Sequence, residues 1–203
     1  MKHARFAAEL LGTFTLTLVV WLSVAFKMDV PASFMAALTL GLFVYMVGGI
    51  SGAHLNPAVT VGMLSIKKIK TNDAMIYIVC QLAGAALAMT IGRVLSQQLG
   101  SVSGQGNVVT AVGEALGAFF LTFAVASVTL QKVPAAAAGF VVGGSLLLGL
   151  FVASPFSAAI LNPAVALGVN AFGPMYILGP LVGAVAGAWA RLKLEDGKSH
   201  HHA

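Results

Sequence analysis

The chain has 203 residues, of which 59% are hydrophobic and only 8% are charged. Soluble domains carry about 25% charged residues, so this composition excludes an ordinary soluble domain and indicates a membrane protein. The formal charge of +5 is divided among the predicted loops and forms no patch beside aromatic residues, which argues against nucleic acid as a partner.

The predicted elements alternate between full membrane spans and two shorter helical stretches. One span needs about 20 apolar residues, so the chain has room for about six. The predicted spans are about 4–26, 32–49, 74–95, 108–130, 135–152 and 173–192. The stretches 56–65 and 162–171 are too short to cross a membrane and are predicted half-helices, each preceded by an irregular segment, 48–55 and 155–161. The predicted fold class is an all-α membrane protein with six transmembrane helices and two half-helices.

The ends of the chain carry no predicted domain of their own. The N-terminal charges lead directly into a full-length span, so no cleavable signal peptide is expected. His200 to His202 resemble the remnant of a purification tag. We therefore expect one transmembrane domain over residues 1–199, with 200–203 as a tag remnant. The lone Cys80 excludes an intramolecular disulfide.

The basic residues predict the orientation of the spans. With the N-terminus inside and six crossings, nine Lys and Arg residues lie inside and two lie outside. The inner set is Lys2, Arg5, Lys67, Lys68, Lys70, Lys132, Arg191, Lys193 and Lys198, and the outer set is Lys27 and Arg93. This asymmetry obeys the positive-inside rule and predicts a multi-pass protein of the cell (inner) membrane with both termini in the cytoplasm.

The chain is also an internal repeat, with halves of about 4–95 and 108–192. Glu9 opens Glu-Leu-Leu-Gly-Thr-Phe, and 105 residues later Glu114 opens Glu-Ala-Leu-Gly-Ala-Phe. Asn56-Pro-Ala returns as Asn162-Pro-Ala, 106 residues later. Three spans in each half force the halves into opposite orientations, so the repeat is inverted and the half-helices meet near the midplane.

Two Asn-Pro-Ala motifs begin the half-helices: Asn56, Pro57 and Ala58, then Asn162, Pro163 and Ala164. Asn is a good N-cap, and Pro suits the first helical position. Two N-termini facing each other place roughly +0.5 elementary charge each at the centre, which repels cations. The Asn side chains supply N–H donors there, which suits a small, neutral, hydrogen-bonding permeant.

Irregular backbone at membrane depth is tolerated where it is shielded by protein or lines a wet cavity. We therefore expect pore-lining backbone carbonyls at Gly52, Ala53, His54, Ala158 and Ile160. No charged ring or carbonyl cage for an ion is visible. No catalytic constellation can be assembled either, so the chain is not expected to be an enzyme, and no cofactor or metal is implied.

These motifs resemble the aquaporin, or major intrinsic protein, family over nearly the whole chain. The resemblance rests on His54 to Thr60, on Leu161 to Ala164, and on the repeats at Glu9 and Glu114 and at Gln81 and Pro180. It implies an hourglass pore in each subunit and a homotetramer. It also implies a narrow outer mouth of four residues, which fall here on Ala36, Leu150, Ala159 and Val165.

The predicted selectivity filter departs from the family pattern. Family members usually carry Arg directly after the second Asn-Pro-Ala, where this chain has Val165. The side chains of the predicted filter are therefore small and apolar, and the opening between them is expected to be wide. A subset of the family associated with arsenic resistance also has Val there and conducts uncharged trivalent arsenic acids. Loss of the Arg should weaken, without abolishing, the rejection of protons and cations.

Several polar or bulky residues have two interpretations. Glu9 and Glu114 either form a proton relay or hold the irregular loops through N–H groups, and the second is favoured because both repeats need such acceptors. His54 is a pH gate or a pore-lining residue, and Cys80 an arsenic ligand or a core residue, with the second interpretation favoured for both. Phe43 and Leu150 could narrow the pore near its centre and mouth, and for Phe43 the alternative is a lipid-facing position or packing in the core.

The predicted function is a passive channel for metalloid acids such as arsenous acid, glycerol-like polyols and water. Its predicted partners are these small neutral solutes and the lipid bilayer. The alternatives are a membrane protein with a closed pore and a structural role, a water-only aquaporin, and a proton-coupled transporter that uses Glu9 or Glu114.

Overall fold

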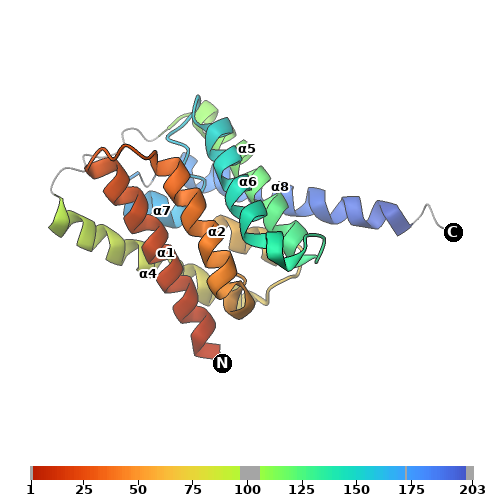
Figure 1. The fold of residues 1–203 in the computed structure, drawn as a ribbon. Helices are drawn as coiled ribbons and strands as arrows, with labels where there is room; N and C mark the ends of the chain where they lie inside the picture. The colour runs from red at the N-terminus through yellow and green to blue at the C-terminus, as the bar shows by residue number, and fades with distance from the viewer. Residues whose placement is uncertain (1, 97–105, 172, 200–203) are drawn as a thin grey trace.

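The computed structural model describes residues 2–96, 106–171 and 173–199, and within them the protein is built of helices without strands (Figure 1). The helices are α1 (Lys2–Ala25), α2 (Ala32–Ser51), α3 (Pro57–Ser65), α4 (Thr71–Leu95), α5 (Val108–Thr129), a 3-10 turn η1 (Ala135–Ala137), α6 (Ala138–Ala153), α7 (Pro163–Gly168) and α8 (Pro174–Ser199). Six of them are long and apolar enough to cross a membrane: α1, α2, α4, α5, η1 with α6, and α8. The predicted fold class is confirmed.

Three predicted boundaries are wrong, two of them beside the half-helices. The first irregular segment is predicted at 48–55, yet α2 continues through Gly48 and Gly49 to Ser51 and ends only at Gly52, whose φ is 87°. The second half-helix is predicted at 162–171, yet α7 ends at Gly168. Asn170 takes a left-handed φ of 59°, and the N–H of Ala171 bonds back to the carbonyl of Ala166 at 2.8 Å, which ends the helix. Asn tolerates this conformation better than most residues.

The predicted sixth span ends near residue 192, but α8 continues to Ser199 and extends away from the bundle in Figure 1. Most of the long loop predicted between the halves, residues 97–105, and the predicted tag remnant, 200–203, lie outside the described residues.

The two halves meet along α2 and α6, which lie side by side in Figure 1. A Cβ at Gly41 would stand 2.8 Å from the carbonyl oxygen of Gly139, and a Cβ at Gly139 would collide with the carbonyl oxygen of Gly41. Tyr45 of α2 adds a hydrogen bond of 2.9 Å from its hydroxyl to the carbonyl of Ala136. Small residues at membrane helix contacts allow this close backbone approach.

Each half-helix packs against the other half of the chain. Gly168 of α7 lies against Thr17 of α1 and Ala85 of α4, and Gly62 of α3 lies against Thr122 of α5 and Ala184 of α8. These are equivalent positions of the repeat, since Gly62 and Gly168 are 106 residues apart and Thr17 and Thr122 are 105 apart. Each half-helix therefore packs against spans of the opposite repeat, and this crossed packing brings both half-helices to the centre of the bundle.

The replacement Gly183→Ala should loosen the packing of α5 against α8. A Cβ at Gly183 would overlap the backbone carbonyl of Ala115, which cannot rotate away, so the helices must separate. Overpacking of this kind costs about 1–3 kcal/mol. The matched control is Gly144→Ala, because a Cβ there meets nothing within 4 Å. We expect a lower thermal denaturation temperature in detergent for Gly183→Ala alone. Equal temperatures for both variants would contradict this account.

Candidate functional site

The site is built around the first turns of α3 and α7. Asn56 has extended backbone angles, with φ −158°, and its side-chain oxygen accepts the N–H of Ala58 at 2.8 Å. Asn162 has φ −147° and accepts the N–H of Ala164 at 3.0 Å. Pro follows each Asn at the first helical position. Both motifs therefore form the N-caps that their sequence predicts.

The two Asn side chains also join the halves reciprocally. Nδ2 of Asn56 donates to the carbonyl of Leu161 at 2.9 Å, and Nδ2 of Asn162 donates to the carbonyl of Leu55 at 2.9 Å. Each amide nitrogen carries two hydrogens, so this crossing uses one and leaves one. Both Asn residues line a cavity of about 850 Å³. The motifs predict donors at the centre, but they do not reveal that half of these donors tie the two loops together.

The irregular segments before the half-helices have left-handed residues at alternate positions. Ala53 and Leu55 have φ values of 48° and 47°, and Ala159 and Leu161 have 50° and 56°. The left-handed conformation costs non-glycine residues roughly 1–2 kcal/mol each. Four such residues at one site require surroundings that hold them in place.

Glu9 holds the first segment. Its side chain is fully buried, and its two oxygens accept four hydrogen bonds. Oε1 accepts from the hydroxyl of Ser51 at 2.7 Å and the N–H of His54 at 3.0 Å. Oε2 accepts from the N–H of Leu55 at 2.7 Å and from Nε2 of Gln81 at 2.8 Å. This geometry supports the loop-holding interpretation over the proton relay.

Glu114 performs the same task in the second half with fewer partners. Its Oε1 accepts from the hydroxyl of Ser157 at 2.7 Å and the N–H of Ile160 at 3.0 Å, and its Oε2 accepts from the N–H of Leu161 at 2.6 Å. The position equivalent to Gln81 is Pro180, which has no side-chain donor. The second carboxylate therefore has one hydrogen bond fewer than the first among the described residues.

The first half has a further polar network beside its segment. Nε2 of Gln81 also donates to the hydroxyl of Thr60 at 2.9 Å, and that hydroxyl donates to the carbonyl of Asn56 at 3.0 Å. Nδ1 of His54 lies 3.2 Å from the same hydroxyl. The equivalents of His54 and Thr60 are Ile160 and Ala166, so the second half has apolar groups at these places. The imidazole of His54 is thus held locally.

A cavity of about 850 Å³ runs along these groups. All four predicted filter residues line it, together with both motif Asn residues and part of the predicted backbone lining: Ala36, Leu150, Ala159, Val165, Asn56, Asn162, His54, Ala158 and Ile160. The predicted lining residues Gly52 and Ala53 are not among its lining, and neither are the motif residues Pro57, Ala58, Pro163 and Ala164. The Pro and Ala residues are buried in packing instead.

An apolar part of the lining was not predicted from the sequence. Val20 and Val24 of α1 and Val169, which follows α7, face the cavity. Their spacing carried the signal, because Val20 and Val24 are one helical turn apart, as are Val165 and Val169. Phe43 is 8% exposed and belongs to the buried core, not to the cavity lining, so its packing interpretation holds.

The described residues contain no group of three or more His, Cys, Asp or Glu side chains that could hold a metal ion. Cys80 lies on α4 and is absent from the cavity lining.

Residues 4–191 match the sequence profile of the family described as "Major intrinsic protein". The chain is 37% identical over 164 residues to Nodulin-26 of Glycine max, covering 75% of this chain and 60% of that protein. It is 31% identical over 233 residues to the probable aquaporin AqpM of Archaeoglobus fulgidus, covering 91% and 94% of the two chains. The chain spans about three fifths of the plant relatives it matches, with 60% of Nodulin-26 and 58% of the rice aquaporin NIP1-1.

Among solved structures, the fold is similar to that of the aquaglyceroporin from Plasmodium falciparum, with a TM-score of 0.71 and 22% identity. The match covers 97% of this chain and 96% of that one. At this identity, the likeness concerns the fold.

Proposed function

The chain belongs to the major intrinsic protein family, and on this basis we propose that it is a passive membrane channel for small uncharged solutes. The family assignment agrees with the expectation of a channel rather than an enzyme. The observation that carries the proposal is the apolar outer part of the cavity, where Val165 stands among Ala36, Leu150 and Ala159. Among the described residues that line the cavity there is no Asp, Glu, Lys or Arg, so an ion would lose its hydration without a charged partner.

The proposed permeants are metalloid acids such as arsenous acid, glycerol-like polyols and water. Each is neutral near pH 7 and carries hydroxyl groups or protons that the remaining Asn N–H donors and the loop carbonyls can bind. The apolar walls formed by Val20, Val24 and Val169 accept the carbon side of a polyol without competing for its hydroxyls. A mouth without Arg gives these larger solutes room beside water.

The proton-coupled transporter has less support. Glu9 and Glu114 are fully buried, are absent from the cavity lining, and use their oxygens to hold loop N–H groups. A relay would require each carboxylate to exchange these partners during every cycle. Loop-holding is therefore the role that we propose for both.

The proposed setting is the cell (inner) membrane, with a homotetramer and both termini in the cytoplasm. Nine basic residues against two support this orientation. Arg5 pairs with Asp73 at 2.9 Å, and Lys132 pairs with Glu195. Both contacts join segments that the charge count assigns to the same side of the membrane. The tetramer rests on the family resemblance and is testable by chemical cross-linking in native membranes.

Stopped-flow light scattering on proteoliposomes tests the proposal. Water, glycerol and arsenous acid are compared with empty liposomes. We expect all three to enter faster through the protein, since the mouth is wide and apolar. Rapid water entry with slow glycerol and arsenous acid entry would favour the water-only alternative. No acceleration of any of the three would favour the closed pore.

A further inference from the structure

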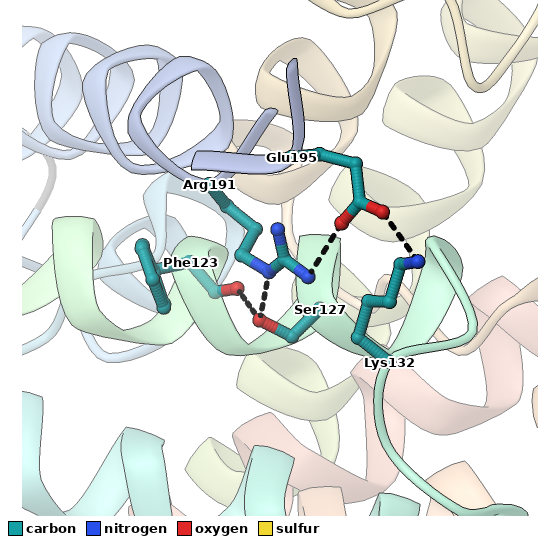
Figure 2. A network of polar contacts seen from close by, with 5 residues as sticks. All are labelled: Phe123, Ser127, Lys132, Arg191 and Glu195. Atoms are coloured by element: carbon teal, nitrogen blue, oxygen red, sulfur yellow. Dashed lines mark hydrogen bonds and ion pairs between the residues drawn. The ribbon is translucent and has the colours of Figure 1, made fainter. Parts of the chain in front are cut away.

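A second cavity, of about 550 Å³, lies away from the pore, where α5, the α5–α6 connection and α8 meet (Figure 2). Its lining residues are Phe123, Ser127, Lys132, Val133, Arg191, Leu194 and Glu195. Nothing in the channel function proposed above uses these side chains. They combine two cations, one carboxylate and three apolar groups in one place.

The polar side chains of this cavity form a connected network, which Figure 2 shows. Nε of Arg191 donates to the hydroxyl of Ser127 at 3.0 Å, and Nη2 of Arg191 donates to Oε2 of Glu195 at 3.2 Å. Lys132 pairs with the other oxygen of Glu195. The hydroxyl of Ser127 donates to the carbonyl of Phe123 at 2.8 Å and brings no charge. Two cations therefore share one carboxylate, and the cavity keeps one net positive charge.

Arg191 and Lys132 also have donor capacity that Ser127 and Glu195 do not take up. In Figure 2 no dashed line reaches one of the two terminal nitrogens of Arg191, and among the described residues no hydrogen bond or ion pair engages Nη1. The Arg191 side chain is only 11% exposed and is held at two points, so its guanidinium is fixed in place. Lys132 is 46% exposed and open to the solvent side. A guanidinium and an ammonium arranged in this way suit the oxygens of a phosphate.

The remaining lining is apolar and lies at a definite depth. Phe123, Val133 and Leu194 form this part, and Leu194 is 61% exposed. The candidate span of α5 ends at Thr129, and Lys132 and Val133 follow in the connection to α6. The cavity thus stands at the end of the α5 span, with the Lys132 ammonium beside apolar groups. A free anion would contact only the cations, whereas an anionic phospholipid has both a charged headgroup and apolar acyl chains.

We propose that this cavity binds the headgroup phosphate of an anionic phospholipid, between Arg191 and Lys132, with the start of an acyl chain on Phe123 and Leu194. Basic pockets between membrane helices on the cytoplasmic side are suited to such headgroups. Glu195 then acts as a competitor, because its carboxylate occupies the same cations. This proposal does not depend on which solute the pore conducts.

The role of Glu195 makes the proposal sharply testable. If the cluster only fastened α8 to α5, removing the Glu195 charge would loosen the cluster and weaken any lipid contact nearby. If the cluster is a phosphate site, Glu195→Gln removes the competitor and should tighten the binding of anionic lipid. Lys132→Gln should weaken it. Lys132 is nearly half exposed, so this variant is expected to fold.

The experiment is native mass spectrometry of the full chain in detergent, titrated with phosphatidylglycerol, phosphatidylcholine or inorganic phosphate. One basic residue near an anionic headgroup changes affinity by about fivefold. We expect phosphatidylglycerol to bind about fivefold more weakly to Lys132→Gln and about fivefold more tightly to Glu195→Gln. The control is Lys67→Gln, an exposed lysine outside the cavity, which should bind within about twofold of the unmodified chain.

Four results would overturn the proposal. Equal binding of phosphatidylcholine would show that the cavity does not distinguish an anionic headgroup from a zwitterionic one. Inorganic phosphate that displaces phosphatidylglycerol at equal concentration would identify a soluble anion as the ligand. Weaker phosphatidylglycerol binding by Glu195→Gln, or an equal loss with Lys67→Gln, would reduce the cluster to a structural contact or to general surface charge.

Discussion

The replacement Val165→Arg is expected to slow glycerol and arsenous acid entry by about tenfold or more, equivalent to an added barrier of about 1.4 kcal/mol, while water entry stays within about twofold. Val165 is 5% exposed, lies in the first turn of α7 and lines the cavity. Arg is far larger and brings five N–H donors into an otherwise apolar wall. It therefore takes up the room that a polyol needs, while its donors still suit single water molecules. Proteoliposome flux measurements check this result.

The matched control is Val165→Leu, which adds volume without charge or donors. If it slows glycerol as strongly as Val165→Arg, the effect is one of size alone. Proton leak measured in the same vesicles further separates the effect of side-chain size from the effect of charge, because only the guanidinium adds a positive charge that repels protons. Unchanged glycerol and arsenous acid flux in Val165→Arg would show that the constriction lies elsewhere along the cavity.

The replacement Glu9→Gln is expected to destabilise the protein by about 1–3 kcal/mol, about as much as the same change at Glu114. Each oxygen of Glu9 faces two donors, so the amide NH₂ meets a backbone N–H in either orientation. The better orientation turns the NH₂ toward Ser51 and His54, because the hydroxyl of Ser51 can turn to accept. The N–H of His54 cannot turn, and it is left without an acceptor.

Glu114→Gln serves as the internal comparison. Its Oε2 faces only the N–H of Leu161 among the described residues, so the amide can turn its NH₂ to that side and lose one bond. We therefore expect a similar loss of about 1–3 kcal/mol here. Thermal denaturation in detergent, with glycerol flux as a second readout, measures both. An unchanged denaturation temperature in either variant would contradict the assigned role of that carboxylate in holding its loop.

Much of the fold was predictable because its signals are local. Apolar length predicts the spans, and Asn followed by Pro predicts a helix start, as Asn56 and Asn162 confirm. The boundary errors at Ser51 and Gly168 have local causes as well. Glycine lowers helix propensity without excluding helix, so α2 continues through residues 48 and 49. The left-handed Asn170 ends α7 sooner than its apolar pattern suggests.

Side-chain direction across the bundle was harder to predict. Phe43 packs in the core, whereas Val20, Val24 and Val169 line the cavity. All are apolar residues in apolar helices, so composition cannot separate the pore from the core or the lipid. A soluble helix reveals its buried face by the contrast with a polar face, and that contrast is lost when both surroundings are apolar.

Residue type and spacing along the chain were enough to predict the six spans and the two half-helix starts. Local hydrogen bonding and apolar length decide each of these features. The way the repeats interlock became visible only in the folded chain, where the half-helices exchange partners and Asn56 and Asn162 reach the loop of the opposite half. The same holds for the meeting of Ser127 and Lys132 with Arg191 and Glu195. These contacts join residues about a hundred or about sixty positions apart, and such pairs are set by how the helices pack, which no local pattern encodes.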